Sequence, residues 1–441
     1  MPRRLLVALC FSLALTACGS LLAKDEWPQF RGPDGTGVSK ASGLPTTWSE
    51  TSNVRWKSPV SGKGHSSPVI SDNQIWLTSS VEIPLSAEEK QRKLAANPDA
   101  KNLKLAGSLS LRAICLDRES GKVLHDVELL KVSEPEPIHA LNSYASPTPL
   151  LENDRLYCHF GTYGTVALDA KTAAIAWTNT EHKIEHQNGP GSSPASSGDL
   201  LVINFDGMDK QYVAALAKQT GKTVWSTTRT GTMDNRPDLK KAYCTPVVWQ
   251  DATGTQVISP GANWVYGYDA KTGRELWKAS YGMLGFSTVP RPIIGHGMVF
   301  VATSFMKSRL VAVKLGGSGD VTESHIAWKS DKQVPQKPSL LLVGDELYFI
   351  SDGGVTTCLD AKTGTELWQQ RMPGQYSASP LFVDGRIYFF SQEGKATVIA
   401  PGKEYKELAV NQLEGSFMAS PAIAGKAMFL RTETHLYRIE Q

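Results

Sequence analysis

The side chains that could do chemistry in this sequence recur a few residues before a series of Pro-led apolar runs. They are His65, Asn142, Tyr144, His186, Tyr243, Arg291, Lys337, Tyr376 and Phe417, with Asp206 and Asp352 in FDG and SDG turns. His65, His186 and Tyr144 are of the types that perform general acid–base chemistry, provided that the fold brings them together. The alternative is that these groups satisfy strand-end backbone groups and one another.

The common catalytic motifs are missing from the sequence. There is no HExxH, no GxxxxGK[ST] and no GxSxG motif, and no acidic run matches an EF-hand loop. The Gly-Lys-Thr at 221–223 lacks an upstream glycine and falls in a predicted hairpin turn. Of the nine histidines, only His182 and His186 have a spacing that could hold a metal. Their context predicts a loop between strands, so we expect no metal site.

Four cysteines follow the N-terminal segment, and each is flanked by apolar residues typical of strands. They are Cys115, Cys158, Cys244 and Cys358. We expect buried free thiols that pack as small apolar side chains. An extracytoplasmic location would also permit disulfides, whose pairing the sequence does not reveal.

A hairpin motif recurs along the chain and indicates the elements that position these residues. The clearest copies are DAKTGRELW at 269–277 and DAKTGTELW at 360–368, and weaker copies end at Trp177, Trp225 and Trp328. A further copy, DRESGKVLH, ends at His125 in place of tryptophan. An apolar strand enters, Asp, Thr and Gly reverse the chain, and a second apolar strand leaves. The motif therefore predicts a β-hairpin at a fixed place in a repeat.

A proline-led strand alternates with this hairpin. The prolines are Pro68, Pro149, Pro194, Pro246, Pro292, Pro338, Pro380 and Pro421. Proline at the start of a strand costs no ladder hydrogen bond. Each unit then contains about four strands in ~45 residues, which is the size of one propeller blade. Eight units predict an all-β, eight-bladed β-propeller of four-stranded antiparallel blades over residues 24–441.

The two ends of the chain indicate how the ring closes. The last unit, after Pro421, stops at Gln441 without a Trp-strand of its own. Trp56, in VRWKSPV, precedes the first Pro-led strand and could supply it. We expect the N-terminal strand to complete the last blade, because closure removes exposed sheet edges.

The tryptophans of the repeat are expected to be structural. Trp56, Trp177, Trp225, Trp277, Trp328 and Trp368 occur about once per unit, where an indole can fill the wedge between neighbouring blades. A ring of ligand-stacking aromatics is the alternative.

An excess of about 30 residues lies in the first unit, near residues 81–107. Ser86 and Glu89 have the spacing of a capping box, and EEKQRKLAA suits a short exposed helix. We expect a charged surface decoration, with a partner-docking arm as the alternative.

Charge and hydropathy limit the classes of partner. The chain has 46 Lys+Arg against 43 Asp+Glu, so it has no overall basic excess for nucleic acid. Residues 1–23 read as a secretory signal, with Arg3 and Arg4 before the apolar run 5–15. No later run is long enough to span a bilayer. We expect an extracytoplasmic protein, in the periplasm or at the outer membrane, without a transmembrane helix.

The end of the signal has two interpretations. Residues 15–18 (LTAC) resemble a lipobox, in which Cys18 would be lipidated and would anchor the protein. Cleavage after Ala23 would instead remove Cys18.

The repeated (A/C)LDxxTGxxxW hairpin resembles the tryptophan-docking repeat of pyrroloquinoline-quinone (PQQ)-type propellers. The opening WPQFRGPDGTGVS, residues 27–39, is similar to secreted PQQ-binding-like β-propeller repeat proteins. That family includes quinoprotein dehydrogenases and the outer-membrane assembly lipoprotein BamB. The resemblance covers nearly all of residues 24–441.

The two branches of this family imply different functions. Enzymes of the quinoprotein branch typically have adjacent cysteines over the quinone and a calcium held by Glu, Asn and Asp. This sequence has no Cys-Cys pair and no CxxCH, and it matches no calcium motif. The resemblance therefore favours the non-catalytic, BamB-like branch.

Three functions remain to be compared. The first is a monomeric scaffold that binds an envelope protein or a carbohydrate, with the residues before the Pro-led strands lining a channel mouth. The second is a PQQ- and calcium-dependent dehydrogenase of an alcohol or sugar. The third is a hydrolase or lyase acting on polysaccharide at the rim, with His65, His186 and Tyr144 as acid–base candidates.

Overall fold

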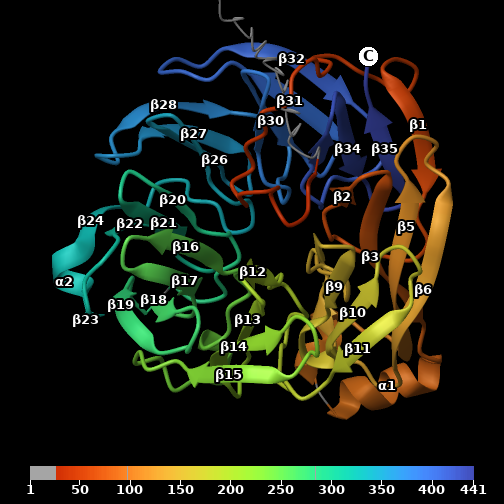
Figure 1. The fold of residues 1–441 in the computed structure, drawn as a ribbon, viewed down its shortest axis with the longest axis horizontal. Coiled ribbons are helices and arrows are strands. Elements are labelled where there is room, and N and C mark those ends of the chain that lie inside the picture. The colour runs from red at the N-terminus through yellow and green to blue at the C-terminus, as the bar shows by residue number, and fades with distance from the viewer. Residues whose placement is uncertain (1–25, 97, 284) are drawn as a thin grey trace, which may run out of the picture.

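Eight four-stranded antiparallel blades form a closed propeller. The computed structural model describes residues 26–96, 98–283 and 285–441. Within those residues, eight sheets follow one another around a central axis, and the N- and C-terminal strands share the last of them (Figure 1). The predicted eight-bladed, all-β architecture is confirmed. The signal segment and Cys18 lie outside the described residues.

The first four blades run in chain order, each from its inner to its outer strand. Blade 1 contains β2 (Val69–Ser71), β3 (Gln74–Ile83), β5 (Ser108–Asp117) and β6 (Val123–Val132). Blade 2 contains β8 (Leu150–Glu152), β9 (Arg155–His159), β10 (Thr165–Asp169) and β11 (Ile175–Asn179). Blade 3 contains β12 (Ala195–Ser197), β13 (Leu200–Asp206), β14 (Gln211–Ala217) and β15 (Thr223–Thr228). Blade 4 contains β16 (Val247–Asp251), β17 (Gly254–Pro260), β18 (Trp264–Asp269) and β19 (Glu275–Ser280).

The last four blades repeat this order. Blade 5 contains β20 (Ile293–Gly295), β21 (Met298–Ala302), β22 (Leu310–Lys314) and β24 (Ile326–Ser330). Blade 6 contains β25 (Leu341–Val343), β26 (Glu346–Ile350), β27 (Val355–Asp360) and β28 (Glu366–Arg371). Blade 7 contains β29 (Leu381–Val383), β30 (Arg386–Phe390), β31 (Lys395–Ile399) and β32 (Glu407–Gln412). Blade 8 contains β33 (Ala422–Ala424), β34 (Ala427–Arg431), β35 (His435–Ile439) and the N-terminal β1 (Val54–Pro59).

A few short elements decorate the blades. β4 (Leu103–Lys104) pairs with β7 (Ile138–His139), and β23 (Gly319–Asp320) adds a short parallel strand to the edge of blade 4. The remaining elements are α1 (Ala87–Ala96), α2 (Thr322–His325), η1 (Pro98–Asn102), η2 (Gly161–Tyr163) and η3 (Pro237–Leu239). With 10 and 4 residues, neither α-helix of the described chain could span a bilayer.

The segment of the first unit between β3 and β5 contains α1. Ser86 Oγ accepts a hydrogen bond from the Glu89 backbone N at 3.2 Å, and Glu89 Oε2 accepts one from the Ser86 backbone N at 3.0 Å. These reciprocal bonds are those of a capping box. The helix lies at the outer edge of blade 1 (Figure 1).

The hairpin motif forms as its residue types dictate. In blade 4, Asp269 Oδ1 accepts bonds from the Thr272 backbone N at 2.8 Å and from Thr272 Oγ1 at 2.6 Å. Gly273 follows at φ +73°, a region that favours glycine. Asp117, Asp169 and Asp360 cap the corresponding turns. These turns and the turns between the first and second strands lie on one face, called here the bottom face. Loops between blades, and between second and third strands, lie on the top face.

Most of the repeat tryptophans lie against a turn of the following blade. Trp177 Nε1 donates to the Lys218 carbonyl at 2.8 Å, and Trp225 Nε1 donates to the Ala270 carbonyl at 3.2 Å. Trp328 and Trp368 make the equivalent bonds to blades 6 and 7. Trp277 differs, because its Nε1 donates within blade 4 to Gln256 Oε1 at 2.9 Å. The following hairpin, in blade 5, is the stretched copy that contains α2.

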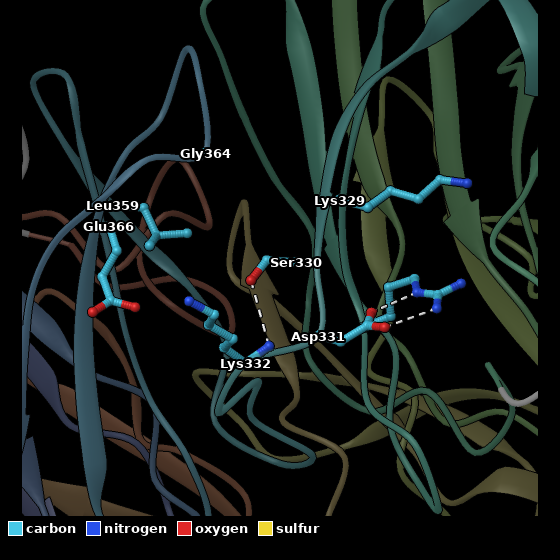
Figure 2. Close-up of a pocket in the computed structure, with 8 residues that line it drawn as sticks. Lys329, Ser330, Asp331, Lys332, Leu359, Gly364 and Glu366 are labelled. Atoms are coloured by element: carbon cyan, nitrogen blue, oxygen red, sulfur yellow. Dashed lines mark hydrogen bonds and ion pairs between the residues drawn. The ribbon is translucent and has the colours of Figure 1, made fainter.

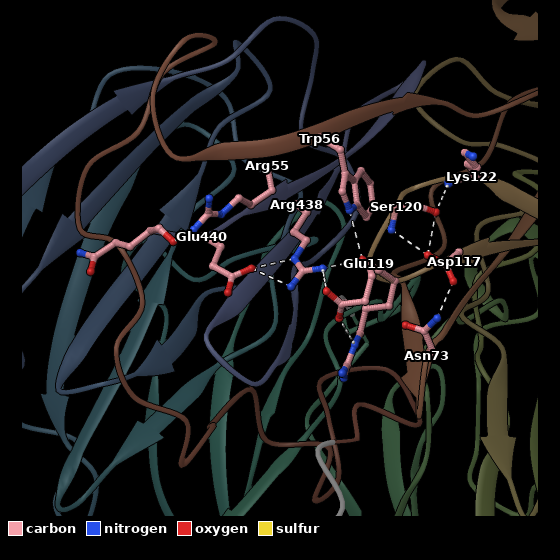
Figure 3. Close-up of polar contacts among 11 residues, drawn as sticks. Arg55, Trp56, Asn73, Asp117, Glu119, Ser120, Lys122, Arg438 and Glu440 are labelled. Atoms are coloured by element: carbon pink, nitrogen blue, oxygen red, sulfur yellow. Dashed lines mark hydrogen bonds and ion pairs between the residues drawn. The ribbon is translucent and has the colours of Figure 1, made fainter.

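The ring closes where blade 8 meets blade 1. β1 pairs antiparallel with β35, with Trp56 opposite Arg438. Trp56 Nε1 donates to the Arg118 carbonyl at 3.1 Å, and Arg438 Nη1 donates to the same carbonyl at 2.9 Å. Arg438 also contacts Glu119 at 2.6 Å. Figure 3 shows these contacts joining both chain ends to the blade 1 turn. The predicted closure by the N-terminal strand is confirmed.

Candidate functional site

A ring of hydrogen bonds surrounds the channel at the top ends of the inner strands. At six of the eight junctions between blades, the residue just before the inner strand donates its backbone N–H to a Ser or Thr hydroxyl of the next blade. The bonds are Ser67 to Thr148, Thr148 to Ser193, Ser193 to Thr245, Arg291 to Ser339, Ser339 to Ser379 and Ser379 to Ser420, at 2.9–3.0 Å. These small polar residues therefore join neighbouring blades.

The register of blade 6 differs from the pattern of the other blades. Ser339, which takes part in the ring, is followed by Leu340 and not by proline. Pro338 therefore lies two residues before the position that proline occupies elsewhere, and the predicted Pro-led strand start is wrong by that amount. The inner strand β25 still forms, because its apolar residues continue the pattern.

Two buried arginines lie at the two places where no bond of the ring forms among the described residues. Arg291 occupies a Ser or Thr position of the ring, and its Nη1 donates to the Phe30 carbonyl at 2.5 Å. Arg431 Nη1 donates to the Ser66 and Thr78 carbonyls, both at 3.0 Å, between blades 8 and 1. Neither forms an ion pair with a described carboxylate. Burial lowers the pKa of Arg291 to about 10 and that of Arg431 to about 9.

The N-terminal segment 26–44 packs against the inner strands of four blades. Trp27 pairs with Ile70 of β2, Val38 pairs with Phe382 of β29, and Leu151 N donates to the Pro28 carbonyl at 2.8 Å. Arg31, only 3% exposed, donates to the Leu340 carbonyl at 2.6 Å. The inner strands of blades 1, 2, 6 and 7 are thus tied to one segment.

The glycines of this segment allow its close approach. A Cβ at Gly37 (φ +78°) would come within 2.6 Å of Arg31 Nη2. Burial and the nearby charge of Arg291 lower the pKa of Arg31 to about 9. Residues 27–39 were recognised in the sequence only by their resemblance to secreted propeller proteins, and their contacts with the inner strands were not predicted. The high frequency of Gly and Pro at 32–37 was the sequence signal that this backbone packs closely against neighbouring side chains.

Seven of the eleven predicted mouth residues are buried. These are Tyr144, His186, Asp206, Tyr243, Arg291, Tyr376 and Phe417. Tyr144 OH donates to the Glu136 carbonyl at 2.8 Å, and Tyr243 OH donates to the His186 carbonyl at 2.9 Å. Their polar atoms therefore bind backbone groups of the loops, which was the alternative considered from the sequence.

His186 does not approach His65 or Tyr144 through any bond among the described residues. His186 Nε2 accepts from the Thr162 backbone N at 2.9 Å, and its Nδ1 is buried without a partner. Burial lowers its pKa to about 4. His182 bonds to other groups, so these two histidines form no joint metal site with a third described ligand.

Asp206 is held in a buried ion pair between blades 3 and 4. Arg229 donates to Asp206 Oδ1 at 2.5 Å and to Oδ2 at 2.6 Å, and both side chains are fully buried. Arg229 also lies over the Tyr266 ring at 5.0 Å. Burial raises the pKa of Asp206 although Arg229 opposes this shift. Both oxygens of this buried carboxylate are bound by Arg229, and the side chain is not exposed at the mouth.

The remaining four predicted residues, His65, Asn142, Lys337 and Asp352, are partly exposed. Lys337 and Asp352 form an ion pair at 2.6 Å. Asn142 bonds to the carbonyls of the next loop, at 2.7 Å from Asn188. Burial and the charges of Arg431 and Lys104 lower the pKa of His65 to about 3.

Two polar residues of the mouth, Lys104 and His139, were missed from the sequence. Lys104 Nζ donates to the Asn142 carbonyl at 3.0 Å. His139 lies in the same turn, and burial together with the charges of Lys337 and Lys104 lowers its pKa. No sequence signal marked Lys104, because β4 reaches the mouth only through its pairing with β7.

Two surface pockets lie between blades, away from the channel. One, of about 540 Å³, lies between blades 5 and 6 and is lined by charged side chains that include Lys329, Lys332 and Glu366 (Figure 2). Its Arg309 and Asp331 are paired at 2.6 Å. The other, of about 430 Å³, lies between blades 2 and 3.

The residues do not fit a quinone and calcium site of the enzyme type. In the described part of the chain, no three His, Cys, Asp or Glu side chains gather where they could hold a metal ion. The cysteines Cys115, Cys158, Cys244 and Cys358 are free, buried and distributed over different blades. Burial raises the pKa of Cys115 and Cys358 to about 12, which makes them unreactive.

Comparison with known proteins agrees with this architecture. A family model described as outer membrane protein assembly factor BamB matches residues 100–258 and 263–415. The chain belongs to this family of β-propeller repeat proteins. The resemblance inferred from the Asp-to-Trp hairpins is confirmed.

The curated relatives of this BamB-type propeller differ in their printed functions. Tetrathionate hydrolase of Acidithiobacillus ferrooxidans is 25% identical over 77% of this chain and 65% of its own. Quinohemoprotein alcohol dehydrogenase ADH-IIG of Pseudomonas putida is 25% identical over 58% and 36%. BamB of Legionella pneumophila is 26% identical over 37% and 42%. The match spans less than two thirds of each relative.

Solved structures share the fold. BamB from Moraxella catarrhalis superposes with a TM-score of 0.52 and 14% identity, over 82% of this chain and 99% of its own. Quinohemoprotein alcohol dehydrogenase from Comamonas testosteroni superposes with 0.63 and 9% identity, over 94% and 80%. Proteins named as a dehydrogenase and as an assembly factor therefore share this propeller, so the function must be argued from the residues.

Proposed function

We propose that this propeller is an extracytoplasmic scaffold of the cell envelope, which holds a protein or a carbohydrate on its top face. The BamB-type family supports a binding role, and the predicted signal at 1–23 supports the location. A lipid anchor at Cys18 remains part of this proposal. The packing of segment 26–44 against the inner strands of four blades supports recognition at the surface loops.

The observation that carries the proposal is an apolar group on the top-face loops of blades 4 and 5. Met283, Phe305 and Met306 are 50%, 55% and 62% exposed. Phe305 packs edge-to-face on the buried Phe286, with ring centroids 6.0 Å apart. Exposed aromatic and methionine side chains are enriched at protein interfaces, and methionine adapts to different partners. Leu141 adds a further exposed apolar residue on the same face, at 47%.

Site-specific photo-crosslinking in intact cells tests this proposal. A benzoylphenylalanine at Phe305 should form a discrete adduct with an envelope component. The same probe at Val224, on the outer strand of blade 3 and 52% exposed, is the matched control. Adducts that are absent at Phe305, or identical at both positions, would contradict binding at the top face.

The alternative is a PQQ- and calcium-dependent dehydrogenase, and the relative from Pseudomonas putida is the observation that favours it. The missing donor cluster argues against it, because calcium takes six to eight oxygen ligands. A rim hydrolase or lyase has less support, since His186 and Tyr144 are buried and bonded to backbone groups.

A further inference from the structure

The pocket between blades 2 and 3 combines an aromatic wall with many hydrogen-bonding groups. Its volume of about 430 Å³ lies within the range of small-molecule sites. The lining combines His182 and Tyr212 with the charged Glu181, Lys183, Asp209 and Lys210 and with two hydroxyl side chains. None of them belongs to the channel mouth described above.

The aromatic wall is a cluster of three rings, in which His182 and Tyr212 each lie against Phe205 and are 5.7 Å from each other. Tyr212 stacks on Phe205 with centroids 5.1 Å apart and an interplanar angle of 12°. His182 stacks on Phe205 at 4.6 Å. Phe205 is 1% exposed, whereas Tyr212 is partly exposed and lines the pocket. The buried phenyl ring thus holds the tyrosine in a fixed orientation.

A chain of hydrogen bonds fixes the direction of the Tyr212 hydroxyl. Thr223 Oγ1 donates to Glu181 Oε2 at 3.0 Å, which leaves its oxygen to accept from His182 Nε2 at 3.0 Å. A neutral imidazole protonated at Nε2 has Nδ1 as an acceptor. Tyr212 OH, 3.1 Å away, therefore donates to Nδ1. Burial lowers the pKa of His182, which is consistent with the neutral ring.

This direction leaves the phenol oxygen with a free lone pair beside free hydroxyls. The Ser226 and Thr228 hydroxyls have no partner among the described residues, and both side chains are exposed. A polyhydroxylated ligand in the pocket could donate to Tyr212 through one hydroxyl and bond to Ser226 and Thr228 through others. The pocket therefore offers hydrogen-bonding groups of the kind that a polyol can use.

The charges of the pocket are balanced. Glu181 and Asp209 oppose Lys183 and Lys210, and Lys210 lies 4.0 Å from Asp209. Lys183 Nζ is already bound to the Thr162 carbonyl at 2.8 Å. A balanced pocket gives no advantage to an anion or a cation. Because both His182 nitrogens are hydrogen-bonded, the imidazole also offers no lone pair to a metal.

We propose that this pocket is a binding subsite for a neutral saccharide, whose ring packs on Tyr212 and whose hydroxyls bond to the groups around it. A sugar ring has apolar C–H faces and a polar rim, which matches an aromatic wall edged by hydroxyls and carboxylates. The proposal rests on the scaffold function in its carbohydrate form. It assigns that ligand to the pocket between blades 2 and 3.

Calorimetric titration with neutral oligosaccharides tests the subsite. The probes are cellotetraose, maltotetraose and N,N′,N″-triacetylchitotriose, with tetragalacturonate as an anionic comparison. At least one neutral probe should bind, and Tyr212→Ala should weaken its Kd about tenfold or more, because the stacking face is lost. Thr223→Val should weaken it less, since it only frees the orientation of His182. Tyr405→Phe, which removes a surface phenol bonded to Glu407 at 3.0 Å, is the matched control.

Two results would overturn the subsite. One is that no neutral probe binds the wild-type protein, and the other is equal binding by wild type and Tyr212→Ala with both proteins folded by circular dichroism. Tighter binding of tetragalacturonate than of every neutral probe would also refute the neutral class. Crosslinking at Phe305 is independent of Tyr212, so the scaffold proposal can survive when the saccharide subsite fails.

Discussion

The indole of Trp56, on the first strand of the propeller, lies directly on Gly121 in the turn of blade 1. A Cβ at Gly121 would come within 2.7 Å of Trp56 Cδ2, and Gly121 has φ +70°. Gly221, Gly273 and Gly364 have the same relationship to Trp177, Trp225 and Trp328, each with 2.6 Å from the would-be Cβ to the indole Cδ2. The glycine of the repeat is therefore required both by the turn and by the tryptophan of the preceding blade.

The junction between blades 1 and 2, which has neither the tryptophan nor the glycine, supports the conclusion that the indole requires the glycine. Blade 1 has His125 where blades 2–6 and 8 have tryptophan, and the turn of blade 2 has Ala173 where blades 1, 3, 4 and 6 have glycine. Ala173 still adopts φ +59°, and His125 stacks on Trp76 at 5.9 Å. A methyl group is thus tolerated where the smaller imidazole replaces the indole.

Gly121→Ala should therefore destabilise the protein by about 2–4 kcal/mol, from overpacking against Trp56 and Ser58 of β1 together with left-handed strain. Gly385→Ala is the matched control, because Gly385 also has φ +70° but no atom within 4 Å of its would-be Cβ. That control should cost about 1 kcal/mol from strain alone. Urea denaturation measures both values. Equal losses would mean that the contact with Trp56 has no energetic effect.

Removal of the closing strand should unfold the ring. A deletion of residues 50–60 takes away β1 and leaves β35 as an open edge. We expect the variant to be insoluble or to lack a cooperative thermal transition. A folded monomer, by sedimentation and circular dichroism, would refute the requirement for closure.

The Asp206–Arg229 pair should be more important to stability than any exposed pair. Asp206→Asn leaves a buried guanidinium without a carboxylate, and we expect a loss of about 3–5 kcal/mol. Asp331→Asn removes the partner of the half-exposed Arg309, 2.6 Å away, and should cost about 1 kcal/mol or less. Chemical denaturation of both variants checks the difference. A similar cost for the two would indicate that burial of the pair is incomplete.

The ring of Ser and Thr hydroxyls should stabilise the protein because the hydroxyls accept hydrogen bonds from buried backbone N–H groups. Thr148→Val keeps the shape of the side chain but leaves the buried Ser67 N–H without its acceptor, for about 1–3 kcal/mol. Thr172→Val, at an exposed turn, should cost about 1 kcal/mol or less. Amide hydrogen exchange at Ser67 should also accelerate in the first variant. Unchanged exchange there would be incompatible with the ring.

Buried neutral histidines should make the protein sensitive to mild acid. Burial lowers the pKa of His186 to about 4 from an unfolded value of about 6.5, so the unfolded chain binds more protons between these values. Stability is therefore full above pH 6.5 and falls as the pH drops towards 4. His186→Gln should flatten part of this slope. Urea midpoints from pH 7 to pH 4.5 measure it, and identical slopes would show that His186 is already charged in the folded state.

The fold could be predicted because the same short sequence pattern recurs in most of the blades. The Asp-to-Trp hairpins, the Pro-led strands and the spare Trp56 strand specify the number of blades and their closure. The site could be predicted less well. Asp206 has the sequence context of a rim residue, yet Arg229, 23 residues away, binds it within the blade interface. Lys104 reaches the mouth through a two-residue strand pair that no periodicity reveals.

The residues of the pocket between blades 2 and 3 could not be predicted from the sequence for the same reason. His182 was noticed only for its spacing from His186, whereas its partners Tyr212 and Thr223 come from blade 3, 30 and 41 residues away. Such a hydrogen-bond chain depends on how two blades meet, and nothing in either local sequence marks it.

A titration with pyrroloquinoline quinone and Ca²⁺ tests most directly whether this propeller binds ligands without oxidising them. The purified protein should show no saturable change in quinone absorbance, and it should not reduce an artificial electron-accepting dye when ethanol or glucose is added. Saturable quinone binding together with calcium-dependent dye reduction would contradict the scaffold function and establish a dehydrogenase.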